Sequence, residues 1–149
     1  MADRYFEDYV PGSTQEFGTI KVTEAEILEF ATKYDPQTFH TDPVAAAEGP
    51  FGGLIASGWH TTAMMMRLLA DNYLSKVASL GSPGIDELRW IKPVRPGDEL
   101  RLRVTVLQAR PSKSKPDRGL VHSRIEVFNQ DDELVFQAIA LNFLLRRPH

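Results

Sequence analysis

The chain has 149 residues, a formal net charge of −3 and no cysteine. The length suits one domain with a buried core. The slight acidity argues against a dedicated nucleic-acid binder, and the lack of cysteine excludes disulfides, thiolate nucleophiles and cysteine-ligated metals. The charged amino terminus lacks the apolar run of a signal peptide, and the most apolar helical segment, near residues 58–69, is too short to cross a bilayer. We therefore expect a single domain over residues 1–149 in the cytoplasm, without nucleic-acid or membrane partners.

The amino-terminal part of the chain predicts a strand followed by a helix. Residues 15–22 favour the strand. Thr23 followed three residues later by Glu26 is a capping box that opens the helix. We expect this helix to end at residue 33 or 34, because Pro36 disfavours helical geometry in the residue before it.

The remaining elements predict an α+β fold. After a short alanine-rich turn at residues 44–47, residues 59–70 are apolar on almost every side, which predicts a buried central helix. The segments that then favour strands, by alternation and flanking turn residues, are 85–92, 99–108, 120–129 and 133–145. Such alternation is typical of an antiparallel sheet with one face covered. We expect this sheet to wrap around the central helix.

An acid and an imidazole lie five residues apart in the segment YDPQTFH, residues 34–40. The spacing places Asp35 and His40 just past a helix end, where Pro36 keeps the backbone from being a regular helix. Asp and His together can move protons at neutral pH. An Asp that caps a turn beside an exposed His is the alternative at this point.

A glycine-rich segment precedes the central helix, and Gly58 stands at the start of that helix. The first amides of a helix have no partner within the helix and carry the positive end of its dipole. They can therefore stabilise an oxyanion, although these glycines can also serve tight packing alone. Ser57 fits the N-cap better than it fits a nucleophile, because the hydrolase elbow pattern is absent.

The other polar residues give weaker signals. His60, in the first turn of the central helix, is typical of a core or interface residue. Lys92 and Arg95 are cations beside a turn that can meet ligand phosphates. No set of His, Asp and Glu has a recognisable metal-ligand spacing, so we expect no metal.

Two segments together resemble the MaoC-like dehydratases, a family with the hot-dog fold that includes the R-specific enoyl-CoA hydratases. They are ILEFATKYDPQTFHTDPVAAAEGPFGGLIASGWHT, residues 27–61, and RWIKPVRPGDEL, residues 89–100. The first segment is fairly specific for the family, whereas the second occurs more widely among hot-dog proteins. With the strand order, the resemblance covers nearly the whole chain.

The resemblance implies a catalytic site. The hydratase dyad of the family falls on Asp35 and His40, and the glycine whose amide binds the thioester oxygen falls on Gly58. The chain departs from the family pattern at Gln37, where the family has Asn, and at Ser57, where it has His. The implied reaction is reversible addition of water to a trans-2-enoyl thioester, with the CoA thioester as substrate and no separate cofactor.

The resemblance also implies a dimer or higher homo-oligomer in which sheets join edge to edge. We expect the long apolar strand at residues 134–145 to need protection as an exposed edge. The sequence leaves open the acyl chain length and whether CoA or an acyl-carrier protein bears the acyl group. The residues that we assign to substrate contacts are Phe39, Gly53, Ser57, Trp59, Lys92 and Arg95.

Two other functions stay open from the sequence. A hot-dog thioesterase would hydrolyse the thioester, often with a carboxylate on the central helix, but residues 58–70 contain no Asp or Glu. A non-catalytic acyl-CoA-binding protein would keep the fold without the chemistry. Such a protein has no need of both Asp35 and His40, which favours an enzyme.

Overall fold

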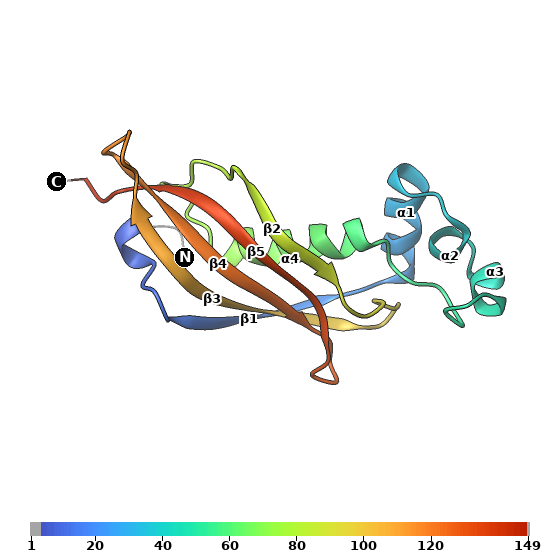
Figure 1. Cartoon of the computed structure of the whole chain (residues 1–149). Helices are drawn as coiled ribbons and strands as arrows, with labels where there is room; N and C mark the ends of the chain where they lie inside the picture. The colour runs from blue at the N-terminus through green and yellow to red at the C-terminus, as the bar shows by residue number, and fades with distance from the viewer. Residues whose placement is uncertain (1–3, 149) are drawn as a thin grey trace.

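A computed structural model describes residues 4–148 of the chain. Five strands form one antiparallel sheet, α4 runs along one face of it, and three shorter helices lie beyond one end of the sheet (Figure 1). In chain order the elements are the 3₁₀ turn η1 (Phe6–Asp8), β1 (Thr14–Lys21), α1 (Glu24–Tyr34), α2 (Thr38–Thr41), α3 (Pro43–Glu48), α4 (Gly58–Asn72), β2 (Gly84–Trp90), β3 (Glu99–Pro111), β4 (Arg118–Phe128) and β5 (Leu134–Leu145). This arrangement confirms the expected α+β architecture.

The sheet has the strand order β1-β3-β4-β5-β2, with every neighbouring pair antiparallel. The alternation in β3 explains its two faces: Leu100 and Leu102 are fully buried towards the core, whereas Arg101 and Arg103 point outwards and remain partly exposed. Each buried aliphatic side chain of this kind stabilises the fold by about 1.5–3 kcal/mol. The alternating pattern read from the sequence therefore fixes which face of the sheet meets α4.

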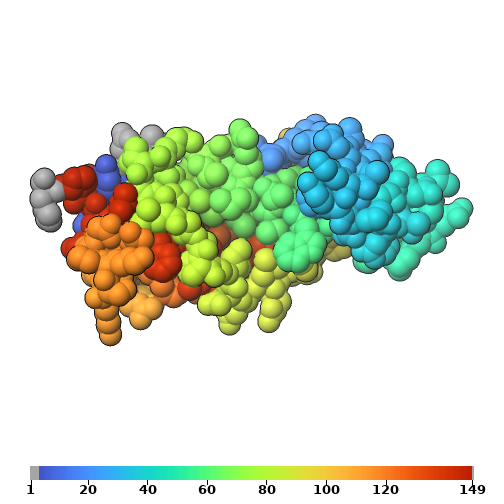
Figure 2. All heavy atoms as spheres, turned by 90° about the horizontal axis from the view of Figure 1, so that it is seen from above, coloured from blue at the N-terminus to red at the C-terminus, as the bar shows by residue number. Residues whose placement is uncertain are grey.

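The helix α4 is buried along one face only. Met65 and Leu69 are each 2% exposed, but Trp59 is 59% and Met66 43% exposed. The surface view shows the α4 segment, in green, open along the middle of the molecule (Figure 2). The expectation of a buried central helix therefore holds for one face of α4, whereas its other apolar residues form a second face that the sheet of the same chain does not reach.

The predicted exposed edge was also wrong. The strand β5 lies between β4 and β2 and pairs with both, so the edges of the sheet are β1 and β2. The order of strands depends on contacts between distant segments, which a local apolar pattern does not encode. Within residues 4–148 no helix is long and apolar enough to cross a membrane.

The helix boundaries position the segment that follows α1. The Thr23 hydroxyl oxygen accepts a hydrogen bond from the Glu26 amide, which confirms the predicted N-cap, and α1 ends at Tyr34 as Pro36 requires. The alanine-rich segment expected as a turn is instead the short helix α3, because the Asp42 carboxylate accepts from two free amides at its start. The helix α1 contacts α4, and α2 and α3 follow beyond the amino-terminal end of α4 (Figure 1).

Candidate active site

Asp35 and His40 come together at the junction of α1 and α2. Asp35 is the C-cap residue of α1, with φ −152° and ψ 67°, and lies outside the helix as expected. His40 lies within the single-turn helix α2, which corrects our expectation of irregular backbone at that position. Its Nε2 is 3.4 Å from Asp35 Oδ2, and the His40 side chain is 6% exposed against 19% for Asp35. The two groups therefore form a pair that is sheltered from water but not sealed from it.

The backbone of Ile55 fixes the orientation of the His40 ring. His40 Nδ1 lies 2.7 Å from the Ile55 carbonyl oxygen, and the Ile55 amide donates to the Phe39 carbonyl at 3.0 Å. Because a carbonyl oxygen only accepts, Nδ1 must carry the hydrogen. In the neutral ring, the basic lone pair is then on Nε2, the nitrogen that faces Asp35.

Two side chains donate to the Asp35 carboxylate. Gln37 Nε2 donates to Oδ1 at 2.7 Å, and the Ser57 hydroxyl donates to Oδ2 at 2.7 Å. The Gln37 hydrogen bond lowers the pKa of Asp35 most, the Ser57 hydrogen bond and the charge of His40 lower it further, and burial opposes them. The Asp35 carboxyl is therefore ionised at neutral pH, with both oxygens held in place.

Ser57 joins this pair to the start of α4. Its side chain is fully buried, and its oxygen accepts from the Trp59 amide at 3.3 Å, which confirms the predicted N-cap role. Its hydrogen bond to Asp35 was not predicted, because the two residues are far apart in the chain. One hydroxyl therefore serves the helix terminus and the carboxylate together.

A cavity of about 310 Å³ opens between His40 and the end of β2, and Asp35 is not among the residues that line it. His40 and Gly58 both line it, and within residues 4–148 the Gly58 amide donates no hydrogen bond. The Trp90 indole packs flat on Gly58, so that a Cβ at position 58 would lie 2.6 Å from Trp90 Cε2. Only glycine allows this close approach. The other lining residues are Phe51, Ile55, Ala56, Thr61, Ile91, Lys92, Pro93 and Val94.

The residues assigned to substrate contacts fall into two groups. Phe39 lies edge-on to the His40 ring, with centroids 4.5 Å apart. Trp59 is exposed and packs edge-on against Trp90 at 5.1 Å, beside the cavity. The structure therefore brings both aromatic residues to the borders of the candidate site.

Lys92 and Arg95 already have polar partners. Lys92 lines the cavity but forms an ion pair with Glu133. Arg95 donates to the Phe51 carbonyl at 2.7 Å and packs beside Gly53, so it holds the glycine-rich segment in place. Substrate contact by any of the six assigned residues stays a prediction.

His60 belongs to the core rather than to the cavity. It is 7% exposed and stacks on Phe30 with centroids 4.9 Å apart. Burial lowers its pKa, so the ring is neutral at pH 7. The sequence-based interpretation of His60 as a core residue agrees with this position.

Comparison with known proteins places these features in a family. Residues 8–126 match the MaoC-like domain family. A MaoC-like dehydratase from Rhodospirillum rubrum has a TM-score of 0.90 and 42% identity, covering 99% of this chain and 100% of that one. The R-hydratase PhaJ1 from Pseudomonas aeruginosa has a TM-score of 0.77 and 25% identity, covering 96% of this chain and 86% of that one.

A curated relative carries a named activity. The 3-hydroxyacyl-thioester dehydratase Z of Mycobacterium tuberculosis is 31% identical over 110 residues, which are 72% of this chain and 73% of the relative. An antiparallel sheet with one long helix on its face, matched across these structures, defines a hot-dog domain. The chain belongs to the MaoC-like dehydratase family, whose relatives here are hydratases and dehydratases.

Proposed function

We propose that this protein is a hydro-lyase that adds water reversibly to a trans-2-enoyl thioester to give a 3-hydroxyacyl thioester. The observation that carries the proposal is the pairing of His40 Nε2 with the held carboxylate of Asp35, at a cavity that also contains the start of α4 at Gly58. A histidine and a carboxylate paired in this way can act as a general base and take a proton from water. Helix amides at Gly58 supply donors for the oxygen that becomes negative.

The proposed reaction uses one water molecule and no cofactor. The dyad removes a proton from water, the oxygen forms a bond to C3, and the electrons of the double bond move to C2 and the thioester carbonyl. The Gly58 amide stabilises the resulting enolate oxygen. A proton from the dyad then reaches C2, so that the atoms of water end on C3 and C2. Asp35 and His40 act as one coupled unit in these two transfers.

The R configuration at C3 and the CoA thiol carrier are the finer parts of this proposal. The similarity to an R-hydratase supports addition to the face that gives the R product. The cavity is lined mostly by apolar and aromatic side chains, which suits an acyl group. Hydrolysis of the thioester has less support, because Asp71, the first carboxylate of α4, lies near its far end in an ion pair with Arg67.

We propose that the working unit is a homodimer joined through the β2 edge. An exposed apolar strip follows the open face of α4 and the adjoining edge strand, and monomers rarely leave such strips uncovered. Pairing at β2 would cover the strip and satisfy the edge amides. The residues that form the strip are Trp59, Met66, Ile85, Trp90 and Ile91.

Incubation of the purified protein with trans-2-enoyl-CoA substrates of increasing length tests the reaction class. Loss of enoyl absorbance with formation of 3-hydroxyacyl-CoA supports the proposal, and chiral chromatography of the product tests the R assignment. Release of free CoA would assign the protein to the thioesterases. Binding without any product would identify a non-catalytic acyl-CoA-binding protein. The same series with acyl-carrier-protein thioesters identifies the thiol carrier.

A further inference from the structure

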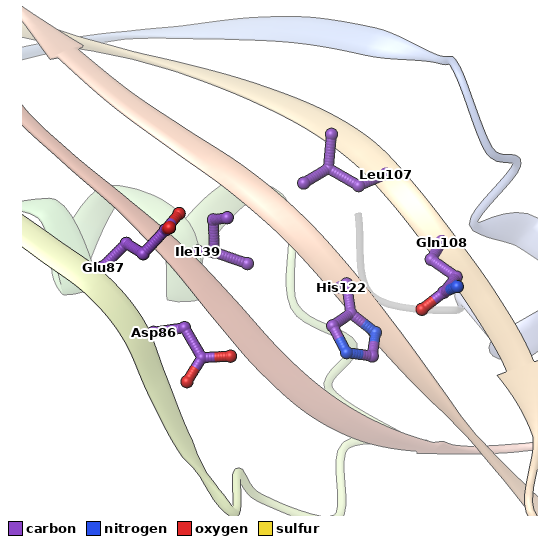
Figure 3. Close-up of a pocket in the computed structure, with 6 residues that line it drawn as sticks. All are labelled: Asp86, Glu87, Leu107, Gln108, His122 and Ile139. Atoms are coloured by element: carbon purple, nitrogen blue, oxygen red, sulfur yellow. The ribbon is translucent and has the colours of Figure 1, made fainter.

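Two histidines have a ring nitrogen that is buried without a hydrogen-bond partner in the part of the chain that the structure describes. They are His60 and His122, and the atom is Nδ1 in each. His122 is partly exposed and lines an open hollow of about 580 Å³ on the outer face of the sheet, together with Asp86 and Glu87 (Figure 3). His60 is 7% exposed and lies in the first turn of α4, beside the candidate active site. His60 is therefore the buried histidine that is placed to influence that site.

A ladder of aromatic rings joins His60 to the end of α1. The His60 ring lies nearly parallel to the Phe30 ring, with centroids 4.9 Å apart and an angle of 11° between the planes. Phe30 in turn contacts Tyr34, the last residue of α1, with centroids 5.3 Å apart. Asp35 follows Tyr34 directly and is the C-cap of α1. The ladder that starts on α4 therefore ends one residue before the carboxylate of the candidate dyad.

A hydrogen bond makes a second link between the two helices. The Ser57 hydroxyl, at the start of α4 and three residues before His60, donates to the Asp35 carboxylate at 2.7 Å. Residues three apart lie on the same side of a helix. Ile27 and Ala31, both 0% exposed, anchor α1 in the core through an adjoining face. The ring stack and the hydrogen bond then fix the end of α1 relative to the start of α4.

The burial of His60 favours its neutral ring. A neutral imidazole carries one N–H, whereas the protonated ring carries an N–H on both nitrogens. In the protonated ring, the Nδ1–H would be buried without an acceptor among residues 4–148. Burial accordingly lowers the pKa of His60, and the charge of Glu26 on α1 opposes this effect. Residues 58–66 of α4 carry no charge, and the charged residues of β1 and β3, which also pack against α4, lie at exposed or outward positions.

We propose that His60 is a positioning residue, which as a neutral ring holds the end of α1 against α4 and so places the Asp35 carboxylate beside His40. None of the described residues that line the cavity belongs to α1. Loosening of α1 therefore displaces Asp35 and leaves the cavity wall in place. The effect on hydration rests on the proposed hydro-lyase function, whereas the effect on the Asp35 carboxyl group does not.

Substitution of Phe30 tests the ladder and leaves both members of the dyad unchanged. Phe30→Leu removes the ring stack and keeps an apolar side chain, whereas Phe30→Tyr keeps the ring. Phe6→Leu is the matched control, because Phe6 is a buried ring that lies against Gly119 and belongs to η1 at the other end of the sheet (Figure 1).

The kinetic constants of these variants separate positioning from substrate binding. We expect Phe30→Leu to lower kcat about tenfold, because a small displacement of a catalytic group is enough for such a loss. KM should stay near the parental value, since the cavity wall is intact, and Phe30→Tyr and Phe6→Leu should keep the parental kcat. A rise in KM without a fall in kcat, or an equal fall of kcat in Phe6→Leu, would overturn the proposal.

Titration of the Asp35 carboxyl group by ¹³C NMR tests the same proposal without an enzyme assay. Hydrogen bonds from Gln37 and Ser57 and the charge of His40 lower the pKa of Asp35. Gln37 is a near neighbour in the chain, whereas Ser57 loses contact if α1 moves away from α4. We expect the pKa of Asp35 to rise in Phe30→Leu and to keep its parental value in Phe30→Tyr and Phe6→Leu. An unchanged pKa in Phe30→Leu would refute the positioning role. If the parent hydrates no enoyl thioester, the proposed function fails, and this titration still decides the role of His60.

The stability of the fold tests whether the ring has to be neutral. Because burial lowers the pKa of His60 from 6.5, the unfolded chain takes up a proton first, and stability is lost as pH falls below 6.5. His60→Phe keeps an aromatic ring that cannot be protonated. In urea titrations we expect the parent to lose stability relative to His60→Phe between about pH 7.5 and about pH 5. A difference between the two proteins that does not change with pH would contradict the neutral, buried ring.

Discussion

The hydroxyl of Ser57 offers a way to perturb Asp35 without removing the carboxylate. Ser57→Ala deletes a 2.7 Å hydrogen bond to Oδ2 from a fully buried donor, while the Gln37 bond to Oδ1 remains. A hydrogen bond to a charged group contributes about 1.5–3 kcal/mol. The Asp35 side chain is 19% exposed, so water can replace part of the lost donor. We therefore expect the transition state to lose about 1.5 kcal/mol of stabilisation. That value corresponds to about a tenfold fall in kcat/KM.

The pH dependence gives a more specific signal than the rate alone. Ser57 lowers the pKa of Asp35, so its removal raises that pKa towards the ordinary carboxyl value. If the ionised carboxylate is needed, the acid limb of the kcat/KM profile moves to higher pH. A lowered carboxyl pKa also stabilises the fold above the ordinary carboxyl pKa, and this contribution is lost as pH falls through the folded-state value. Ser57→Ala should therefore reduce the acid sensitivity of the unfolding free energy.

Ser123→Ala is the matched control for these measurements. Ser123 is 1% exposed and bonds to the Tyr73 hydroxyl at 2.7 Å, so its loss also removes a buried hydroxyl contact, but far from Asp35. Loss of the Ser57 N-cap costs about 0.5–2 kcal/mol of stability, and urea unfolding of both variants corrects for it. An acid limb in Ser57→Ala that coincides with that of the parent would refute the role given to this hydroxyl.

Three further predictions concern packing and ionisation. Gly58→Ala places a Cβ 2.6 Å from the Trp90 indole and should lower the unfolding free energy by about 1–3 kcal/mol, with partial recovery on adding Trp90→Ala in urea titrations. Gly119→Ala would overlap the Phe6 ring and should cost a similar amount, whereas an unchanged urea midpoint would contradict the packing. Burial raises the pKa of Tyr9 from 10.0 to about 12, so stability should fall as pH rises between these values, and less so in Tyr9→Phe.

The sequence predicted those elements whose pattern is local. The capping box at Thr23 and the proline at position 36 set the limits of α1, and the alternation of β3 separated its buried from its outward residues. Both signals come from neighbouring residues, which is why they survive without knowledge of the fold. The single-turn helix that carries His40 was missed, because four residues are too few to show a helical period.

The relations between distant segments could not be predicted from local patterns. The apolar residues of α4 do not reveal which face meets the sheet and which stays open, as Trp59 and Met66 do. The donation from Ser57 to Asp35 and the ion pair between Lys92 and Glu133 each join separate elements. The sequence shows a serine at the start of a helix. It does not show that the chain folds so as to bring this serine close to a carboxylate.

The hydration rate of trans-2-enoyl-CoA by the parent protein, Asp35→Asn and His40→Ala is the measurement that tests the central claim most directly. General acid–base catalysis by the pair predicts that each substitution lowers the rate by about a hundredfold or more while circular dichroism shows a folded chain. Asp71→Asn serves as the matched control, since Asp71 lies near the far end of α4 in an exposed ion pair, and it should keep the parental rate. Hydration that persists at the parental rate in either Asp35→Asn or His40→Ala would contradict the assignment of this pair.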